Sequence, residues 1–403
     1  MTLDMAKVVS QVRDLITSLN DSAAQWQARR HAAFQVFQDS ARAVESLQPK
    51  VKANKDSEKF PWRIAEILEG LANSYTPSPP PRDFTVIATD GSHIEADRHS
   101  PIKCCLLNIS QVMLRYGYQS DAILKNESII LRPEELYIND PSSPRRLHLE
   151  GNLLGMKRTV AELEALADMA EQMSHPQATL ALMDGSLFWR PEGRPFPEFV
   201  RTQFVENGIL AALERLSKML SRPLSVAGYI SHSRGDEVTG NLRLFLCPKD
   251  NPDCRNMCRS RTPDDLTCGP LEGLLDRDIF IQLLCPDERS AVFASRAYAP
   301  QKNRREHKTY FFYLRIEDEI ARVEVPEWVA QDPELVDLTH SLVVDQCRRG
   351  QGYPVAISEA HEQAVVTTRD REQFWQLVHL NLAESSLSED TSGKSRSKRT
   401  RWV

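Results

Sequence analysis

The sequence has no long apolar run and no recognisable export signal. No stretch approaches the roughly 18 unbroken apolar residues of a membrane-spanning helix. The opening segment MTLDMAKVVSQVRDLITSL is amphipathic and interrupted by acidic residues, without the apolar core and small-residue cleavage site of a signal peptide. We therefore expect a cytoplasmic protein that is not associated with a membrane.

Glycine, cysteine patterns and net charge also exclude several classes of protein. Only 16 of 403 residues are glycine, and no glycine-dense loop or Walker sequence is present, which argues against a nucleotide-binding enzyme. The eight cysteines lack the spacing of a small secreted disulfide framework. With 41% hydrophobic and 26% charged residues and a formal net charge of −6, the composition is globular, and it still permits a local basic groove.

A helical N-terminal extension precedes a larger α/β region. Apolar residues recur at helical spacing from Met5 to about Leu47, which predicts one long helix or two stacked helices, acting as a support or as a partner-binding coiled coil. A further helix is expected around residues 62–71, and the proline-rich segment TPSPPPR then ends the extension. We place a helical extension at 1–75, a larger α/β domain at 76–370 and a disordered tail at 384–403.

The order of strands and helices in the larger region indicates its fold. Apolar, β-branched runs predict three consecutive strands, after which helices and strands alternate. The expected segments are strands within 84–90, 104–117 and 128–133, a helix at 153–173, a strand at 178–184, a helix at 199–220 and a strand at 224–230. This βββαβαβ order favours an α/β fold with a ribonuclease H-like mixed sheet, extended by N-terminal helices and a C-terminal helix from about Pro354.

Two similar segments place an aspartate after a buried strand. They are VIATDGSHI around Asp90 and LALMDGSLF around Asp184, and each predicts a strand that ends at the aspartate before a sharp Gly-Ser turn. In a βββαβαβ fold the first and fourth strands are parallel neighbours, so both carboxylates would emerge together. Their repulsion would be relieved by divalent cations, and paired ions suit phosphodiester hydrolysis. The alternative is that each aspartate only caps its turn.

The segments ATDGSHI, LMDGSLF and GYPVAISEAH together resemble, in the same order, the three landmark motifs of the NurA family of DNA-repair nucleases. The similarity extends over about 84–366. It implies a nuclease with a ribonuclease H-like core that depends on Mn²⁺ or Mg²⁺ and cleaves single- and double-stranded DNA with 5′ to 3′ exonuclease polarity, with or without endonuclease activity on single strands. It also implies a homodimer that works with the hexameric ATPase HerA on DNA ends.

The resemblance assigns metal-binding residues. Asp90 and Asp184 match the two metal-binding aspartates of the family, and the family's Arg-x-x-x-Glu pattern matches Arg158 and Glu162. A spacing of four residues puts this pair on one face of a helix. Glu164 is the competing glutamate, about 200° away around the helix, and Glu162 could also be an ordinary exposed residue.

Three further residues are candidates for the site. Tyr353 and His361 match the tyrosine and histidine of the C-terminal motif, so that His361 would bind metal or orient the scissile phosphate and Tyr353 would contact phosphate. A histidine on an amphipathic helix is otherwise an ordinary surface or core residue. Asp276 follows an apolar run and would either join the metal cluster or cap a helix.

An insertion at 247–268 holds half of the cysteines. They are Cys247, Cys254, Cys258 and Cys268. Four thiolates could bind Zn²⁺ or an iron–sulfur cluster, although the spacing lacks the usual C-x₂-C pairs. Free thiols in an inserted loop are the alternative.

Two other functions compete with a metal-dependent nuclease. An actin-like ATPase or sugar kinase also begins with strand–Asp–Gly, but requires a phosphate loop that is not evident in the sequence. A non-catalytic DNA-binding or scaffold protein would keep the fold without its chemistry. Retention of both Asp-Gly-Ser motifs favours the nuclease.

Overall fold

In the computed structural model the chain forms two compact units, each made from two separate segments. Unit 1 comprises Met1–Pro77 and Ile230–Ala330, and unit 2 comprises Ser78–Tyr229 and Gln331–Val403. The structure describes residues 3–55, 57–97, 100, 102–188, 196–219, 223–262, 265–295 and 308–384. The region expected as one domain at 76–370 therefore includes about a hundred residues that pack with the N-terminal extension instead. Almost all of the expected tail lies outside the described residues.

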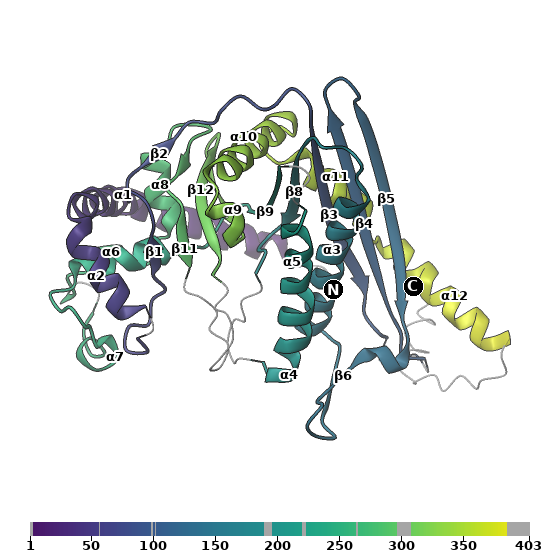
Figure 1. The fold of residues 1–403 in the computed structure, drawn as a ribbon. Coiled ribbons are helices and arrows are strands. Elements are labelled where there is room, and N and C mark those ends of the chain that lie inside the picture. The colour runs from purple at the N-terminus through teal and green to yellow at the C-terminus, as the bar shows by residue number, and fades with distance from the viewer. Residues whose placement is uncertain are drawn as a thin grey trace. The chain divides into compact units, whose positions relative to one another are not determined.

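Unit 2 is built on a mixed sheet (Figure 1). Strands β3, β4 and β5 pair antiparallel as a meander, β8 runs parallel to β3, and β9 runs parallel to β8. The sheet order is thus β9-β8-β3-β4-β5. The elements are β3 (Phe84–Ile94), β4 (Cys105–Tyr116), β5 (Asp121–Leu131), η1 (Pro133–Leu136), β6 (Tyr137–Asn139), β7 (Arg146–His148), α3 (Asn152–Gln172), β8 (Ala178–Asp184), α4 (Glu198–Arg201), the π-helix η2 (Thr202–Leu210), α5 (Ala211–Ser217), β9 (Leu224–Ile230), α10 (Pro333–Arg349), α11 (Val355–Ala364) and α12 (Thr368–Glu384). This topology confirms the predicted ribonuclease H-like mixed sheet.

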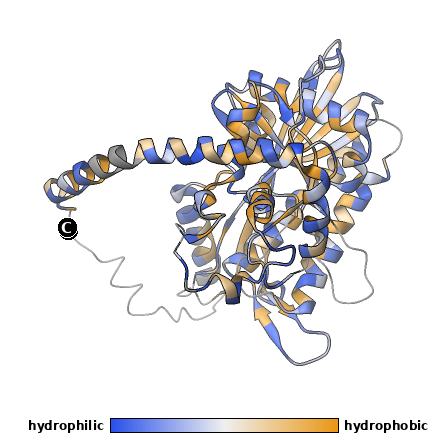
Figure 2. Ribbon diagram, turned by 90° about the vertical axis from the view of Figure 1, so that its left-hand side faces the viewer, coloured by the Kyte–Doolittle hydropathy of each residue, from blue (hydrophilic) through white to orange (hydrophobic). Residues whose placement is uncertain are grey.

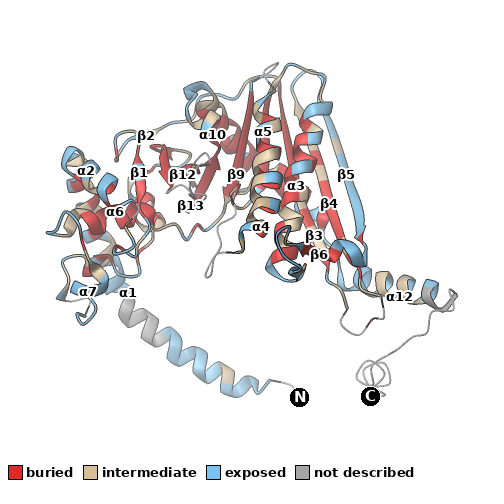
Figure 3. Ribbon diagram, turned by 60° about the horizontal axis from the view of Figure 1, so that its bottom comes forward, coloured by how far each residue is buried: buried red, intermediate tan, exposed pale blue. Residues whose placement is uncertain are grey.

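Helices α3 and α11 pack on the centre of this sheet. Helix α3 contacts β3 and β4, and α11 contacts β3, β4 and β5. Strands β3, β4 and β8 are largely buried, whereas the edge strand β5 is exposed along nearly all of its length (Figure 3). The two helices therefore bring their side chains to the strands that carry Asp90 and Asp184.

Unit 1 combines helices with a second set of strands. Its strands β1, β11, β12 and β13 pair antiparallel in that order, and β10 joins β2 to β12. Its elements are α1 (Met5–Arg42), α2 (Val44–Asn54), β1 (Ala65–Ile67), β2 (Ser74–Tyr75), α6 (Glu237–Leu246), α7 (Cys254–Met257), η4 (Gly269–Leu271), α8 (Asp276–Leu283), β10 (Arg289–Ser290), β11 (Phe293–Ser295), β12 (Tyr310–Ile316), β13 (Glu319–Val325) and α9 (Glu327–Ala330). Its core is aromatic, with Phe37, Phe280, Phe293 and Phe311 fully buried.

The N-terminal extension forms two helices, one of the two predicted arrangements. The C-terminal part of α1 buries Ala33 and Phe37 in the core of unit 1, whereas Met5, Val9 and Val12 in its N-terminal part are exposed. Figure 2 shows apolar and polar residues alternating along this helix. Among the described residues, no helix is both long and apolar enough to span a membrane.

The helix expected at 62–71 is wrong. Residues 65–67 instead form β1, in which Ala65 and Ile67 are buried and Glu66 is exposed. This period of two matches a strand, and β1 pairs with β11 while the Asn241 side chain binds both the N–H and the C=O of Ala65. Pairing with a distant strand overrides the local helical pattern.

Candidate active site

Asp90 and Asp184 lie side by side on two parallel strands. The pairing of β3 with β8 ends at Thr89 and Met183, the residues directly before the two aspartates. Strand β8 ends at Asp184, and Gly185 follows with a φ of +86°, as the Gly-Ser turn predicts. Strand β3 instead continues to Ile94, so the turn expected after Asp90 does not form.

Gly91 leaves room for the carboxyl group of Glu162. A Cβ atom at Gly91 would lie 2.7 Å from Oε1 of Glu162 and 3.0 Å from Cγ of Arg158. The Thr89 hydroxyl donates a hydrogen bond of 3.0 Å to the backbone carbonyl of Glu162, which holds α3 against β3. The glycine of the first Asp-Gly-Ser motif thus allows a close approach between strand and helix rather than a turn.

Glu162 is buried beside the two aspartates. It is only 5% exposed, whereas Glu164 is exposed, so the structure brings Glu162 to the site. Its Oε1 lies 2.9 Å from Nε of Arg158 in an ion pair. Burial raises the pKa of Glu162 to about 7, the Arg158 charge opposes this, and the negative charges of Asp90 and Asp184 add to the increase.

Tyr353 holds the second aspartate. Its hydroxyl donates a hydrogen bond of 2.9 Å to Oδ1 of Asp184, and its ring packs edge-on against Tyr229 with centroids 5.5 Å apart. Burial and the charge of Asp184 raise the pKa of the Tyr353 hydroxyl. The hydroxyl therefore remains a protonated donor at neutral pH.

His361 holds the first aspartate from helix α11. Its Nδ1 lies 2.9 Å from Oδ2 of Asp90, while the Asp90 Oδ1 accepts the N–H of Gly91 at 2.7 Å. The imidazole is 63% exposed, so its other ring nitrogen can reach a ligand in solvent. His361 thus connects the aspartate to the open side of the site.

Ser92 and Asn108, which the sequence analysis did not identify as site residues, fix the end of α11. The Ser92 hydroxyl and the Asn108 side-chain amide both donate to the backbone carbonyl of Ala364, at 2.5 and 3.0 Å. The two residues are paired across β3 and β4. The sequence could have indicated this pair only through two polar residues at facing positions of buried strands. Recognising that they face each other requires the register of β3 and β4.

The donor set fits a hard divalent cation. Three carboxyl groups and an imidazole supply the oxygen and nitrogen atoms that Mg²⁺ and Mn²⁺ accept. The buried Oε1 of Glu162 faces Arg158 in the ion pair but makes no well-aligned hydrogen bond, so it can still accept a cation as a ligand. In the described part of the chain, no three His, Cys, Asp or Glu side chains have the spacing of a preformed metal centre. Asp90 and Asp184 are each held by a protein partner.

Asp276 does not join this cluster. It belongs to unit 1, is fully buried, and accepts hydrogen bonds from the N–H groups of Val238 and Thr239 and from the hydroxyls of Thr239 and Tyr313. These donors saturate its carboxylate. Asp276 thereby caps the first turn of α6, the second of its two expected roles.

The cysteines of the insertion also lie in unit 1. All eight cysteines of the chain are free thiols, and the four in the insertion, Cys247, Cys254, Cys258 and Cys268, are half-buried. They therefore form no disulfide, and they are not part of the carboxylate cluster.

The comparisons with known proteins agree with the motifs. A family model described as the NurA domain matches residues 84–366, more than half of the chain. No curated protein matches the sequence. Among solved structures, the prototype foamy virus protease–reverse transcriptase has a TM-score of 0.20 and 15% identity, aligned over 38% of this chain and 19% of its own. LC9-RNase H1, a type 1 RNase H with the type 2 active-site motif, has a TM-score of 0.20 and 10% identity. The alignment covers 41% of this chain and 72% of LC9-RNase H1. Likenesses this weak do not indicate a shared function.

Proposed function

Because the chain belongs to the NurA family, which is a family of nucleases, we propose that it is a metal-dependent DNA nuclease whose active site is the carboxylate cluster of unit 2. One observation carries the proposal. Glu162 is buried next to Asp90 and Asp184, where its ionised form is unfavourable without a cation. The ion pair with Arg158 offsets this cost only in part, because the pKa of Glu162 stays raised.

Asp90, Glu162, Asp184 and His361 would hold the ions, in a two-metal arrangement of Mg²⁺ or Mn²⁺. Bound there, the ions would supply a nucleophilic water and neutralise charge on the scissile phosphate. Arg158 would contact phosphate oxygens through N–H groups not used in its pair with Glu162, and Tyr353 would do so by turning its single O–H from Asp184 to the phosphate. The exposed face of His361 would orient the phosphate.

The proposal extends to substrate and partners through the family motifs. We expect 5′ to 3′ exonuclease activity on single- and double-stranded DNA, and a circular single strand tests for endonuclease activity. The chain would act as a homodimer and with a HerA-type hexameric ATPase during the processing of DNA ends. These points rest on the motifs around Asp90, Asp184 and His361.

The test is cleavage of DNA labelled at its 5′ or 3′ end, single- or double-stranded, in Mn²⁺, Mg²⁺ or EDTA. We expect cleavage only with metal, and the label released first reports the polarity. Asp184→Asn and Glu162→Gln should each lower cleavage by at least about 100-fold, since even outer-shell partners of metal ligands contribute about 10- to 100-fold. Glu164→Gln is the matched control on the same helix and should cleave normally.

Binding measured on the same DNA separates the competing functions. A protein that binds DNA in EDTA but never cleaves it, even with the ATPase added, would be the non-catalytic scaffold. Full activity of Asp184→Asn would contradict the proposed site. Tight binding of ATP by this chain alone would favour the kinase-like alternative.

A further inference from the structure

The cysteine-containing insertion of unit 1, residues 247–268, turns its cysteines inward while most of its other residues face solvent. Among its described residues only Pro252 is buried, and those of intermediate exposure are the four cysteines, Asp253 and Leu266. Helix α7, within the insertion, has no buried residue. A segment of this length without its own apolar core needs another source of order.

The four thiols come from three points along the insertion. Cys247 follows the last residue of α6, and Cys268 directly precedes η4. Cys254 and Cys258 are one helical turn apart, with the N–H of Cys258 donating to the carbonyl of Cys254 at 3.2 Å. This spacing puts Cys254 and Cys258 on one side of α7.

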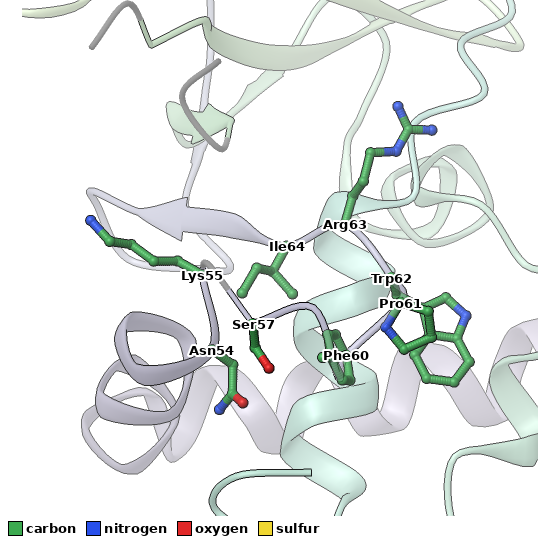
Figure 4. A pocket seen from close by; sticks show the side chains of 8 residues that line it. All are labelled: Asn54, Lys55, Ser57, Phe60, Pro61, Trp62, Arg63 and Ile64. Carbon is green, nitrogen blue, oxygen red and sulfur yellow. The ribbon is translucent and has the colours of Figure 1, made fainter. Parts of the chain in front are cut away.

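The first half of the insertion is tied to α2 and to the segment that follows α2. The Lys50 ammonium on α2 donates to the carbonyl of Cys247 at 3.0 Å, and the Asn54 amide donates to that of Asp250 at 2.8 Å. The N–H of Cys254 donates to the carbonyl of Lys59 at 3.1 Å. Figure 4 shows Asn54 together with Phe60 and Trp62 in a small pocket that follows α2. These anchors hold the first half of the insertion beside α2.

The thiols are close enough to influence one another. Cys258, Cys247 and Cys268 all lie near enough to Cys254 to act electrostatically on its thiol. Cys254 and Cys258 also contact each other directly, and Cys268 is hydrogen-bonded to Arg243. Arg243 lies one turn before Cys247 on α6. The four thiols therefore lie in one part of unit 1, beside the Arg243 side chain.

We propose that Cys247, Cys254, Cys258 and Cys268 bind one Zn²⁺ that orders the insertion. Four thiolates are a complete tetrahedral ligand set, which suits a structural rather than a catalytic ion. Each thiol releases its proton to solvent on binding, and the Arg243 guanidinium beside Cys268 offsets part of the resulting charge of −2. In this structure the four sulfurs are not spaced as the ligands of one metal ion. The proposal therefore requires the insertion to close around the ion when it binds.

The test is the metal content of tag-free protein purified without chelator. We expect one zinc per chain by elemental analysis, released in full when a mercurial reagent titrates the thiols. A Cys254→Ser, Cys258→Ser double variant should lose the zinc, and its insertion should become sensitive to limited proteolysis. Cys285→Ser, which alters an exposed cysteine outside the insertion, should keep the zinc.

The outcomes separate this proposal from the nuclease. Iron with inorganic sulfide would overturn it in favour of an iron–sulfur cluster. Absence of stoichiometric metal, with the four thiols reacting at the rate of Cys285, would overturn it in favour of free thiols. Zinc content is measured without any cleavage assay, so it is independent of whether unit 2 is a nuclease.

Discussion

The carboxyl group of Glu162 should make the stability of the metal-free protein depend on pH. Its folded pKa, about 7, lies above the unfolded value of 4.5, so the folded state holds the proton more tightly. The stabilisation from this group is complete below the unfolded pKa and is lost as pH rises through about 7. Between pH 5 and 8 the free energy of unfolding of the wild type should fall relative to Glu162→Gln by on the order of 3 kcal/mol.

Urea unfolding in EDTA at a series of pH values measures this difference. Glu164→Gln is the control and should follow the wild type, because Glu164 is exposed. Saturating Mn²⁺ should stabilise the wild type at pH 8 but not Glu162→Gln. Parallel pH curves for the wild type and Glu162→Gln would contradict a raised pKa.

Gly91 should control the position of the Glu162 carboxyl group. In Gly91→Ala the new Cβ would lie 2.7 Å from Oε1 of Glu162 and 2.9 Å from Cδ1 of Ile109, so both side chains must move. We expect at least a 10-fold loss of kcat and a cost in folding free energy of about 1–3 kcal/mol. Gly155→Ala on α3 has open space around the new atom and should keep activity and stability. Equal activity of the two variants would remove this role of Gly91.

At the scale of elements, helix α11 should depend on its attachment to β3 and β4. Ser92→Ala and Asn108→Ala each remove one donor to the carbonyl of Ala364, three residues after His361. We expect faster amide hydrogen exchange in the last turn of α11 and several-fold lower cleavage, with Asp90 and Asp184 unchanged. Ser358→Ala, at an exposed position of the same helix, is the control. Unchanged exchange in α11 would show that the two donors do not position His361.

Elements with strong local patterns could be predicted from the sequence, and those set by distant pairing could not. The apolar runs at 84–90 and 178–184 gave β3 and β8 because buried parallel strands are continuously apolar. Strand β1 was mistaken for a helix because its partner β11 lies more than 200 residues away. The pairing of Ser92 with Asn108 could not be predicted for a different reason, since it depends on the register between the neighbouring strands β3 and β4, whereas Asp90 and Asp184 could be predicted from their motifs.

At the scale of the whole molecule, the grouping of residues 230–330 with the N-terminal helices could not be predicted either. The core of unit 1 combines Phe37 of α1 with Phe280 of α8 and Phe311 of β12. No local pattern links such distant segments, since each only shows an apolar face. The proline-rich segment, where the sequence predicts a domain boundary, lies close to the first boundary between the units. The chain passes back into unit 1 after Tyr229, and no comparable sequence feature marks that point.

This division leads to a prediction for Asp276, whose four hydrogen bonds lie within unit 1. Asp276→Asn removes one acceptor from a fully buried network, which should cost about 1–3 kcal/mol. Amide exchange should accelerate at Val238 and Thr239, while β3, β8 and metal-dependent cleavage stay as in the wild type. Asp318→Asn, at an exposed position, is the control. Lost cleavage with unchanged exchange in α6 would instead make Asp276 a metal ligand, the role that its donors now argue against.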